Sequence, residues 1–234
     1  MESTRLRPVT TNPDGRLDRA ALLRLAADNG PPIEGAAGAL FPPRVTATGT
    51  MRRLLDEALR QFAARGFHAV SVRDLAGAVG IHPSTVYAHV KSKEDILAEL
   101  IKHGHDEHLE RLTLALEKVG EDPGDRLSAL IGAHVRLHAE YPLLARVCNR
   151  ELESLSGESR RQAYAMRVRA EEFFLDVVMR GQRAGLFREC EPLLAVTALG
   201  SIGIRVAEWW RPEFGVSVDE LVATYTDFAR GMLA

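Results

Sequence analysis

The chain has 234 residues, of which 46% are hydrophobic, 26% charged and 6% aromatic, and this composition is typical of a folded globular protein. It excludes a chain that is disordered throughout, a collagen-like chain and a coiled-coil rod. The longest apolar stretch, residues 192–204, is broken by Gly200, Ser201 and Gly203 and is too short to cross a bilayer, so no membrane partner is expected. The N-terminus has no apolar run of the secretory type, which predicts a cytoplasmic protein.

The charge is unevenly distributed along the chain. The net charge is −2, but residues 44–93 contain eight basic and three acidic residues and carry +5, which leaves −7 elsewhere. Clustered positive charge attracts phosphate, so a basic module on an acidic body indicates a polyanionic partner. A solvated basic face gives the same pattern, and this alternative stays open on charge alone.

The first 47 residues are expected to form an arm. Six of the eleven prolines lie within the first 43 residues and alternate with glycines, a pattern that predicts partial disorder. One short helix is possible over residues 17–28, although so short a helix cannot bury a core. Arg44 is placed to reach a phosphate or a minor groove, and the alternative is an unstructured leader.

From residue 50 onward the sequence predicts an all-α fold of about nine helices in two units. Met51, Leu54, Leu55, Ala58 and Phe62 form one apolar stripe at helical spacing. Helix starts are marked by prolines at residues 142 and 192 and by three capping boxes, in which an acid follows a serine by three residues. These are Ser71 with Asp74, Ser92 with Asp95, and Ser217 with Glu220.

Residues 71–90 have the pattern of a helix-turn-helix. Two short helices, 71–79 and 84–90, flank a turn in which Gly80 suits a left-handed position and Pro83 the next helix start. The second helix can pack Val86 and Val90 inward. It then presents Ser84, Thr85, Tyr87 and His89 outward, as a major-groove helix must. A plain corner of two helices has the same spacing.

Taken together, several segments resemble the N-terminal domain of TetR-family transcriptional regulators over about 50 residues. They are Ala58–Phe62, Arg65–Phe67, Ser71–Ala76, Gly80–Ile81, Ser84–Tyr87, His89–Val90 and Lys91–Leu97. The family's usual Phe after the His is Val90 here, and its usual Gly or Ala before the Thr is Ser84.

The resemblance implies a DNA-binding domain over residues 48–95 and assigns its contacts. Base contacts are expected from Arg73 and Thr85, with His82 and Ser84 as further candidates. Phosphate contacts are expected from Tyr87, His89 and Lys93, and Thr50 marks the end of the arm at the DNA. Tyr87 has a second interpretation as a buried packing residue. The expected partner is double-stranded DNA with a palindromic operator.

The second half is similar to TetR-like repressors of lipid, acyl-CoA and steroid catabolism. The segments that carry this likeness are Ala145–Leu152, Gly185–Phe187, Pro192–Ala195, Trp209–Pro212 and Ser217–Leu221. The resemblance implies a ligand-binding and dimerisation domain over residues 96–234 and a repressor released by a small hydrophobic or acyl-type effector, such as acyl-CoA or another lipid-like molecule. It also implies a homodimer built on residues 192–211 and 218–233. The alternative is that this stretch is the core of a monomer.

Four histidines interrupt two otherwise apolar helix faces. His105 and His108 share a stripe with Leu97, Ile101, Leu112 and Leu116, and His134 and His138 share one with Leu127, Ile131 and Tyr141. In an antiparallel hairpin His108 lies level with His134 and His105 with His138. The four imidazoles, with Leu112, then either line an effector pocket or bind a divalent metal such as zinc. Separately satisfied core histidines are the third interpretation.

Enzyme functions are not favoured. The sequence has no G-x-S-x-G, H-E-x-x-H, phosphate loop or dinucleotide fingerprint, and Cys148 and Cys190 are too few for a disulfide framework or a paired metal site. The competing function is a helical protein that binds a lipid or senses a metal and whose helix-turn-helix no longer binds DNA. A gel shift with the protein's own upstream DNA separates the two.

Overall fold

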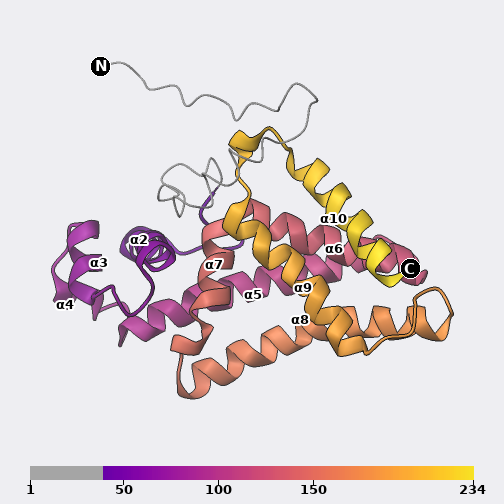
Figure 1. Ribbon diagram of the computed structural model, residues 1–234. Helices are drawn as coiled ribbons and strands as arrows, with labels where there is room; N and C mark the ends of the chain where they lie inside the picture. Colours follow the sequence, from indigo (N-terminus) through magenta and orange to yellow (C-terminus); the bar gives the residue numbers. More distant parts are fainter. Residues whose placement is uncertain (1–38) are drawn as a thin grey trace.

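The computed structural model describes residues 39–234, and the expectations for residues 1–38, including the short helix, lie outside this range. Residues 39–234 form nine α-helices and no strand, so the predicted all-α class is confirmed (Figure 1). None of these helices combines the length and the apolar character needed to span a bilayer. The helices are α2 (Gly49–Arg65), α3 (Val72–Val79), α4 (Pro83–Val86), α5 (Lys93–Glu117), α6 (Pro123–Glu140), α7 (Pro142–Arg150), α8 (Gly157–Arg183), α9 (Pro192–Trp209) and α10 (Val218–Leu233), with short 3-10 helices η1 (Leu152–Ser154) and η2 (Pro212–Phe214).

The ends of the helices follow the predicted signals. All three capping boxes are formed, with the serine hydroxyl accepting from the backbone and the acid three residues later bonding back. Pro142 and Pro192 open α7 and α9. Gly80 ends α3 with φ 74° and ψ 37°, a left-handed conformation that a residue with a Cβ adopts at a cost. Local sequence therefore sets where these helices begin and end.

The last residues of the predicted arm are packed against the body, which corrects the expectation of an unstructured leader for this stretch. Phe41 and Val45 are buried, and the Arg52 guanidinium lies 5.1 Å from the centroid of the Phe41 ring. Arg44 forms an ion pair with Glu110 of α5. In this structure Arg44 is thus engaged with α5.

The buried side chains form two hydrophobic cores. The first core joins α2–α4 to the start of α5, α7 and η1, through residues such as Phe62, Leu100 and Val147. The second core joins the end of α5 to α6, α9, α10 and the later part of α8, through residues such as Leu112 and Phe174. The predicted domain boundary at residues 95 and 96 lies inside the first core, so α2–α4 and the start of α5 form one packed unit.

Helices α5 and α8 connect the two cores. In Figure 1, α3 and α4 lie at one end of the molecule and the C-terminus of α10 at the other, with α5 and α8 running along the length between them. A second link is polar, because Glu94 in the first turn of α5 accepts hydrogen bonds from the backbone N–H and the hydroxyl of Ser156, just before α8. Both long helices are therefore attached directly to the helix-turn-helix end.

Candidate functional site

The helix-turn-helix is formed as the spacing predicts, with a shorter second helix. Leu75 and Ala76 of α3 are buried, and Val86 and Val90 pack inward. Helix α4 covers only Pro83–Val86, and the chain continues to His89 in turns bonded to the preceding carbonyls. The second helix is thus shorter than the predicted 84–90 span, while its inward face is the predicted one.

Most of the predicted DNA-contacting side chains lie on the outer surface of this motif. Arg73, Ser84 and His89 are exposed and Tyr87 is 56% exposed, so the alternative that Tyr87 is a buried packing residue is wrong. Thr85 and Thr50 are half-buried. His82 is also exposed and caps α4, since its Nδ1 accepts from the Ser84 N–H and bonds the Ser84 hydroxyl at 2.8 Å.

Lys93, which the resemblance implies as a phosphate contact, is bonded inside the protein in this structure. Its Nζ donates to the carbonyls of Phe67 and Val70 at 2.7 and 2.6 Å and lies 4.0 Å from the centroid of the Phe67 ring. Partial burial lowers the pKa of Lys93. The ammonium ties the α2–α3 loop to the start of α5, whereas the neighbouring Lys91 is exposed and offers its charge to solvent.

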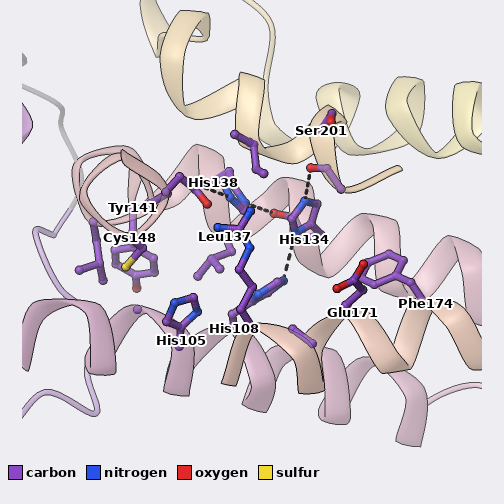
Figure 2. Close-up of a pocket in the computed structure, with 18 of the residues that line it drawn as sticks. His105, His108, His134, Leu137, His138, Tyr141, Cys148, Glu171, Phe174 and Ser201 are labelled. Atoms are coloured by element: carbon purple, nitrogen blue, oxygen red, sulfur yellow. Dashed lines mark hydrogen bonds between the residues drawn. The ribbon is translucent and has the colours of Figure 1, made fainter. Parts of the chain in front are cut away.

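A pocket of about 220 Å³ lies where the two hydrophobic cores meet (Figure 2). Its wall combines Leu144 and Cys148, which belong to the first core, with Ala170 and Phe174, which belong to the second. All four predicted histidines line it, but Leu112 does not and lies in the second core instead. The other lining residues are Gly104, Leu137, Tyr141, Ala145, Asn149, Arg167, Glu171, Val196, Thr197, Gly200, Ser201 and Ile204.

Three of the histidines form a hydrogen-bonded chain whose protons can be assigned. His134 Nε2 lies 2.9 Å from the Gly200 carbonyl, which only accepts, so this nitrogen carries the proton and Nδ1 is free to accept. His108 Nε2–H then donates to His134 Nδ1 at 3.0 Å. His138 Nδ1–H donates to the His134 carbonyl, and its Nε2 accepts from Asn149. The chain links α5, α6, α7 and α9.

Burial keeps these imidazoles neutral. It lowers the pKa of His138 to about 3 and that of His105 to about 4, and it also lowers the pKa values of His108 and His134. Charged Arg167 contributes in the same direction for His105, His134 and His138. Burial also raises the pKa of the Cys148 thiol to about 12, which leaves this side chain as an unreactive wall residue.

The predicted metal site is not formed. Within residues 39–234 no group of three or more His, Cys, Asp or Glu side chains is arranged to hold a metal ion. The reason is visible in the hydrogen bonds, because His134 and His138 use both ring nitrogens for bonds inside the protein and have no lone pair to offer. His105, expected opposite His138, makes no hydrogen bond through its Nε2. The interpretation as pocket lining fits this geometry.

Several polar pocket residues could not be found from the sequence. Arg167 and Glu171 lie on α8, whose polar residues look like an ordinary solvent-facing side, and Asn149 lies in a short helix of mixed character. Only the structure shows why residue 203 is a glycine, because a Cβ there would lie 2.2 Å from Cδ2 of His134. The sequence shows a low-charge stretch with the small residues Gly200, Ser201 and Gly203. It does not show that Gly203 makes room for the imidazole of His134.

Comparison with known families and proteins identifies the chain. Residues 54–100 match the family model described as bacterial regulatory proteins, tetR family, and residues 120–233 match the one described as tetracyclin repressor-like, C-terminal domain. The structure of the TetR-family regulator PfmR from Thermus thermophilus is similar with a TM-score of 0.69 and 33% identity, over 78% of this chain and 96% of that chain. The chain belongs to the TetR family of transcriptional regulators.

Two further relatives agree with this assignment. The transcriptional repressor KstR2 of Rhodococcus jostii (strain RHA1) is 28% identical over 191 residues, which cover 80% of this chain and 92% of the relative. The structure of AibR in complex with isovaleryl coenzyme A and operator DNA has the same fold, with a TM-score of 0.68 and 21% identity over 78% of this chain and 97% of that chain. As a TetR-family member, this protein is a ligand-responsive DNA-binding transcriptional regulator and not an enzyme. The alternative of a lipid-binding or metal-sensing protein with an inactive helix-turn-helix is not favoured.

Proposed function

We propose that the protein is a dimeric repressor that binds a palindromic operator and releases it when a small hydrophobic or acyl-type effector enters the pocket. The observation that carries the DNA-binding half is the outer surface of α3 and α4. It displays Arg73, Ser84, Tyr87 and His89 on a motif whose inner side is buried. A DNA partner implies a cytoplasmic location.

On this surface the side chains divide into two roles. Arg73 and Thr85 read bases, with His82 and Ser84 as supporting contacts, because they lie on α3 and on the start of the second helix. Tyr87 and His89, together with exposed Lys91, contact phosphates. Thr50, in the first turn of α2, lies near the end of a helix and can approach the backbone of the duplex.

The dimer is proposed to form through α9 and α10. A palindromic operator needs two recognition helices about one turn of DNA apart, which a two-fold dimer provides. Leu193 and Leu194 of α9 and Phe228 of α10 are large apolar side chains left exposed in the single chain. A second copy that covers them would remove this apolar surface from water.

The effector is proposed to occupy the histidine-lined pocket. The surface of the pocket is mostly apolar, with polar and charged side chains among its lining residues, as small-molecule sites generally have. It touches α5 and α8, and both helices are attached to the helix-turn-helix end. A ligand that favours one spacing of these helices can therefore shift DNA affinity. AibR, whose structure has the same fold, binds isovaleryl coenzyme A, and this supports the proposal of an acyl-type effector.

The test is a gel shift with the DNA upstream of the protein's own gene, compared with shuffled DNA at physiological salt. The wild type is expected to bind upstream DNA selectively, and Arg73→Ala or Thr85→Ala should reduce discrimination by an amount equivalent to about 1–3 kcal/mol. Arg183→Ala, an exposed arginine at the far end of α8, is the matched control. Equal binding of both DNAs by the wild type would refute the proposal.

A further inference from the structure

The wall of the pocket carries a cation without a partner inside the protein. Arg167 of α8 lines the pocket and is exposed, and no hydrogen bond or ion pair connects it to any other residue between 39 and 234. Arg111 of α5, which does not line the pocket, differs in this respect, because Glu107 and Glu140 hold it at 2.6 and 2.7 Å. An arginine next to a cavity with its guanidinium uncommitted is suited to bind a carboxylate through two parallel hydrogen bonds.

Arg167 acts on the histidine side of the pocket. Burial is the main cause of the pKa shifts of His105, His134, His138 and Cys148, and the charge of Arg167 is a further cause that lowers the pKa of each. Glu171, one turn later on the same helix, also lines the pocket. An anion placed among the histidines is therefore attracted by Arg167.

A second polar atom in the wall has no partner. His105 is only 7% exposed, and its Nε2 is buried without a hydrogen bond among the described residues. A buried polar nitrogen without a partner costs free energy, which a ligand oxygen can recover. His105 is neutral, so its ring can place a proton on Nε2 and donate it. Figure 2 shows His105 on the same side of the pocket as Tyr141 and Cys148.

The rest of the pocket limits the size and polarity of its ligand. A volume of about 220 Å³ lies below the roughly 300–1,000 Å³ of pockets for drug-sized ligands, so the occupant is compact. Phe174, Leu137, Val196 and Ile204 supply an apolar wall. Both ring nitrogens of His134 and of His138 are hydrogen-bonded inside the protein. These two rings therefore contact the ligand mainly through van der Waals packing.

We infer that the ligand is a compact apolar monocarboxylate. Its carboxylate pairs with the guanidinium of Arg167 and accepts a hydrogen bond from Nε2–H of His105, while its hydrocarbon part packs against Phe174 and Ile204. This inference rests on the proposed effector function of the same pocket and names the class of effector as the free acid.

The test measures binding to the full-length protein by calorimetry, with no DNA present. Octanoate and octanamide are the probes, because they have nearly the same shape and differ in charge. The wild type is expected to bind octanoate at least about tenfold more tightly than octanamide, as a charge-assisted hydrogen bond allows. Arg167→Gln should remove most of this difference, and His105→Phe should reduce octanoate affinity more than octanamide affinity.

Arg169→Gln is the matched control, because Arg169 is an exposed arginine of α8 outside the pocket wall and its loss should leave both affinities unchanged. The melting temperature of each variant checks that it is folded. Equal binding of acid and amide by the wild type, unchanged preference in Arg167→Gln, or no binding of octanoate, hexanoate or butanoate at millimolar concentration would each overturn the inference.

Octanoyl-coenzyme A separates this inference from the proposed function. If the thioester binds and releases operator DNA while the free acid does not bind, the carboxylate inference is wrong and the proposed function stands. If octanoate binds through Arg167 but leaves operator affinity unchanged, the carboxylate inference is supported and the effector role of the pocket is wrong.

Discussion

At the scale of single residues, His138 makes the protein sensitive to pH. Burial holds its pKa at about 3 in the folded protein, against about 6.5 in an unfolded chain. Between these values the unfolded chain binds a proton that the folded protein does not. The free energy of unfolding therefore falls as the pH decreases below 6.5 and is fully present above it.

For His138 alone the loss between pH 8 and pH 5 amounts to about 2 kcal/mol. Denaturant unfolding curves of His138→Asn should show a pH dependence weaker by this amount than the wild type. His89→Asn, the same substitution at an exposed histidine, is the control. An identical pH dependence for wild type and His138→Asn would mean that the imidazole is not neutral in the fold.

Gly203 is required by the imidazole of His134. A Cβ at this position would lie 2.2 Å from Cδ2 and 2.4 Å from Nε2 of His134, the nitrogen that donates to the Gly200 carbonyl. Gly203→Ala is expected to displace the ring and destabilise the protein by about 1–3 kcal/mol. Gly200→Ala, one turn away with nothing within 4 Å of its Cβ, should be neutral or stabilising by up to about 1 kcal/mol. Equal midpoints for the two variants in denaturant would contradict this packing.

Features that depend on neighbours in the sequence were predictable, and most of the polar residues that line the pocket were not. The capping boxes, Gly80 and the inward Val86 depend on neighbours within a few positions, and all were predicted. The pairing of His108 with His134 followed from the hairpin geometry. Arg167 could not be identified in this way, because its importance comes from a pocket assembled by five helices.

At the scale of elements, two lysines at the start of α5 have different environments: Lys91 precedes the helix and Lys93 is its first residue. Lys93 holds the α2–α3 loop through two carbonyls, while Lys91 is exposed beside the recognition segment. Lys91→Gln is expected to reduce the slope of log affinity against log salt concentration by about 1. Lys93→Gln should lower the melting temperature and leave that slope unchanged. A reduced slope for Lys93→Gln would restore its role as a phosphate contact.

The helices themselves were largely predictable, but the packing between them was not. Periodicity and caps indicated about nine helices, and the resemblance to TetR-family regulators implied a boundary at residue 95. The hydrophobic cores cross this boundary, because Ile96 and Leu100 of α5 pack with α2 and α7. Which residues share a core depends on contacts between α2 and α7, which are distant in the sequence. The packed segment that contains Phe41 was missed because its prolines resembled a loose leader.

At the scale of the whole molecule, the apolar surface of α9 governs the proposed dimer. Leu194 is 70% exposed in the single chain. Leu194→Glu would place a charge in the interface, and we expect a monomer that no longer binds the operator, as measured by sedimentation and gel shift. Leu114→Glu on α5, a comparably apolar exposed position, is the control. A Leu194→Glu variant that is still dimeric would place the interface elsewhere.

The meeting of two hydrophobic cores at the pocket also has a thermodynamic consequence. The two cores have different members and the pocket lies between them, so we expect them to separate in their response to heat. We expect a calorimetric trace with two overlapping transitions, in which the van't Hoff enthalpy is smaller than the calorimetric enthalpy. A ligand that contacts both cores should merge the transitions into one. Hydrogen exchange should then slow together in Leu100 of the first core and Leu199 of the second, because filling the pocket makes the protein unfold as a single unit.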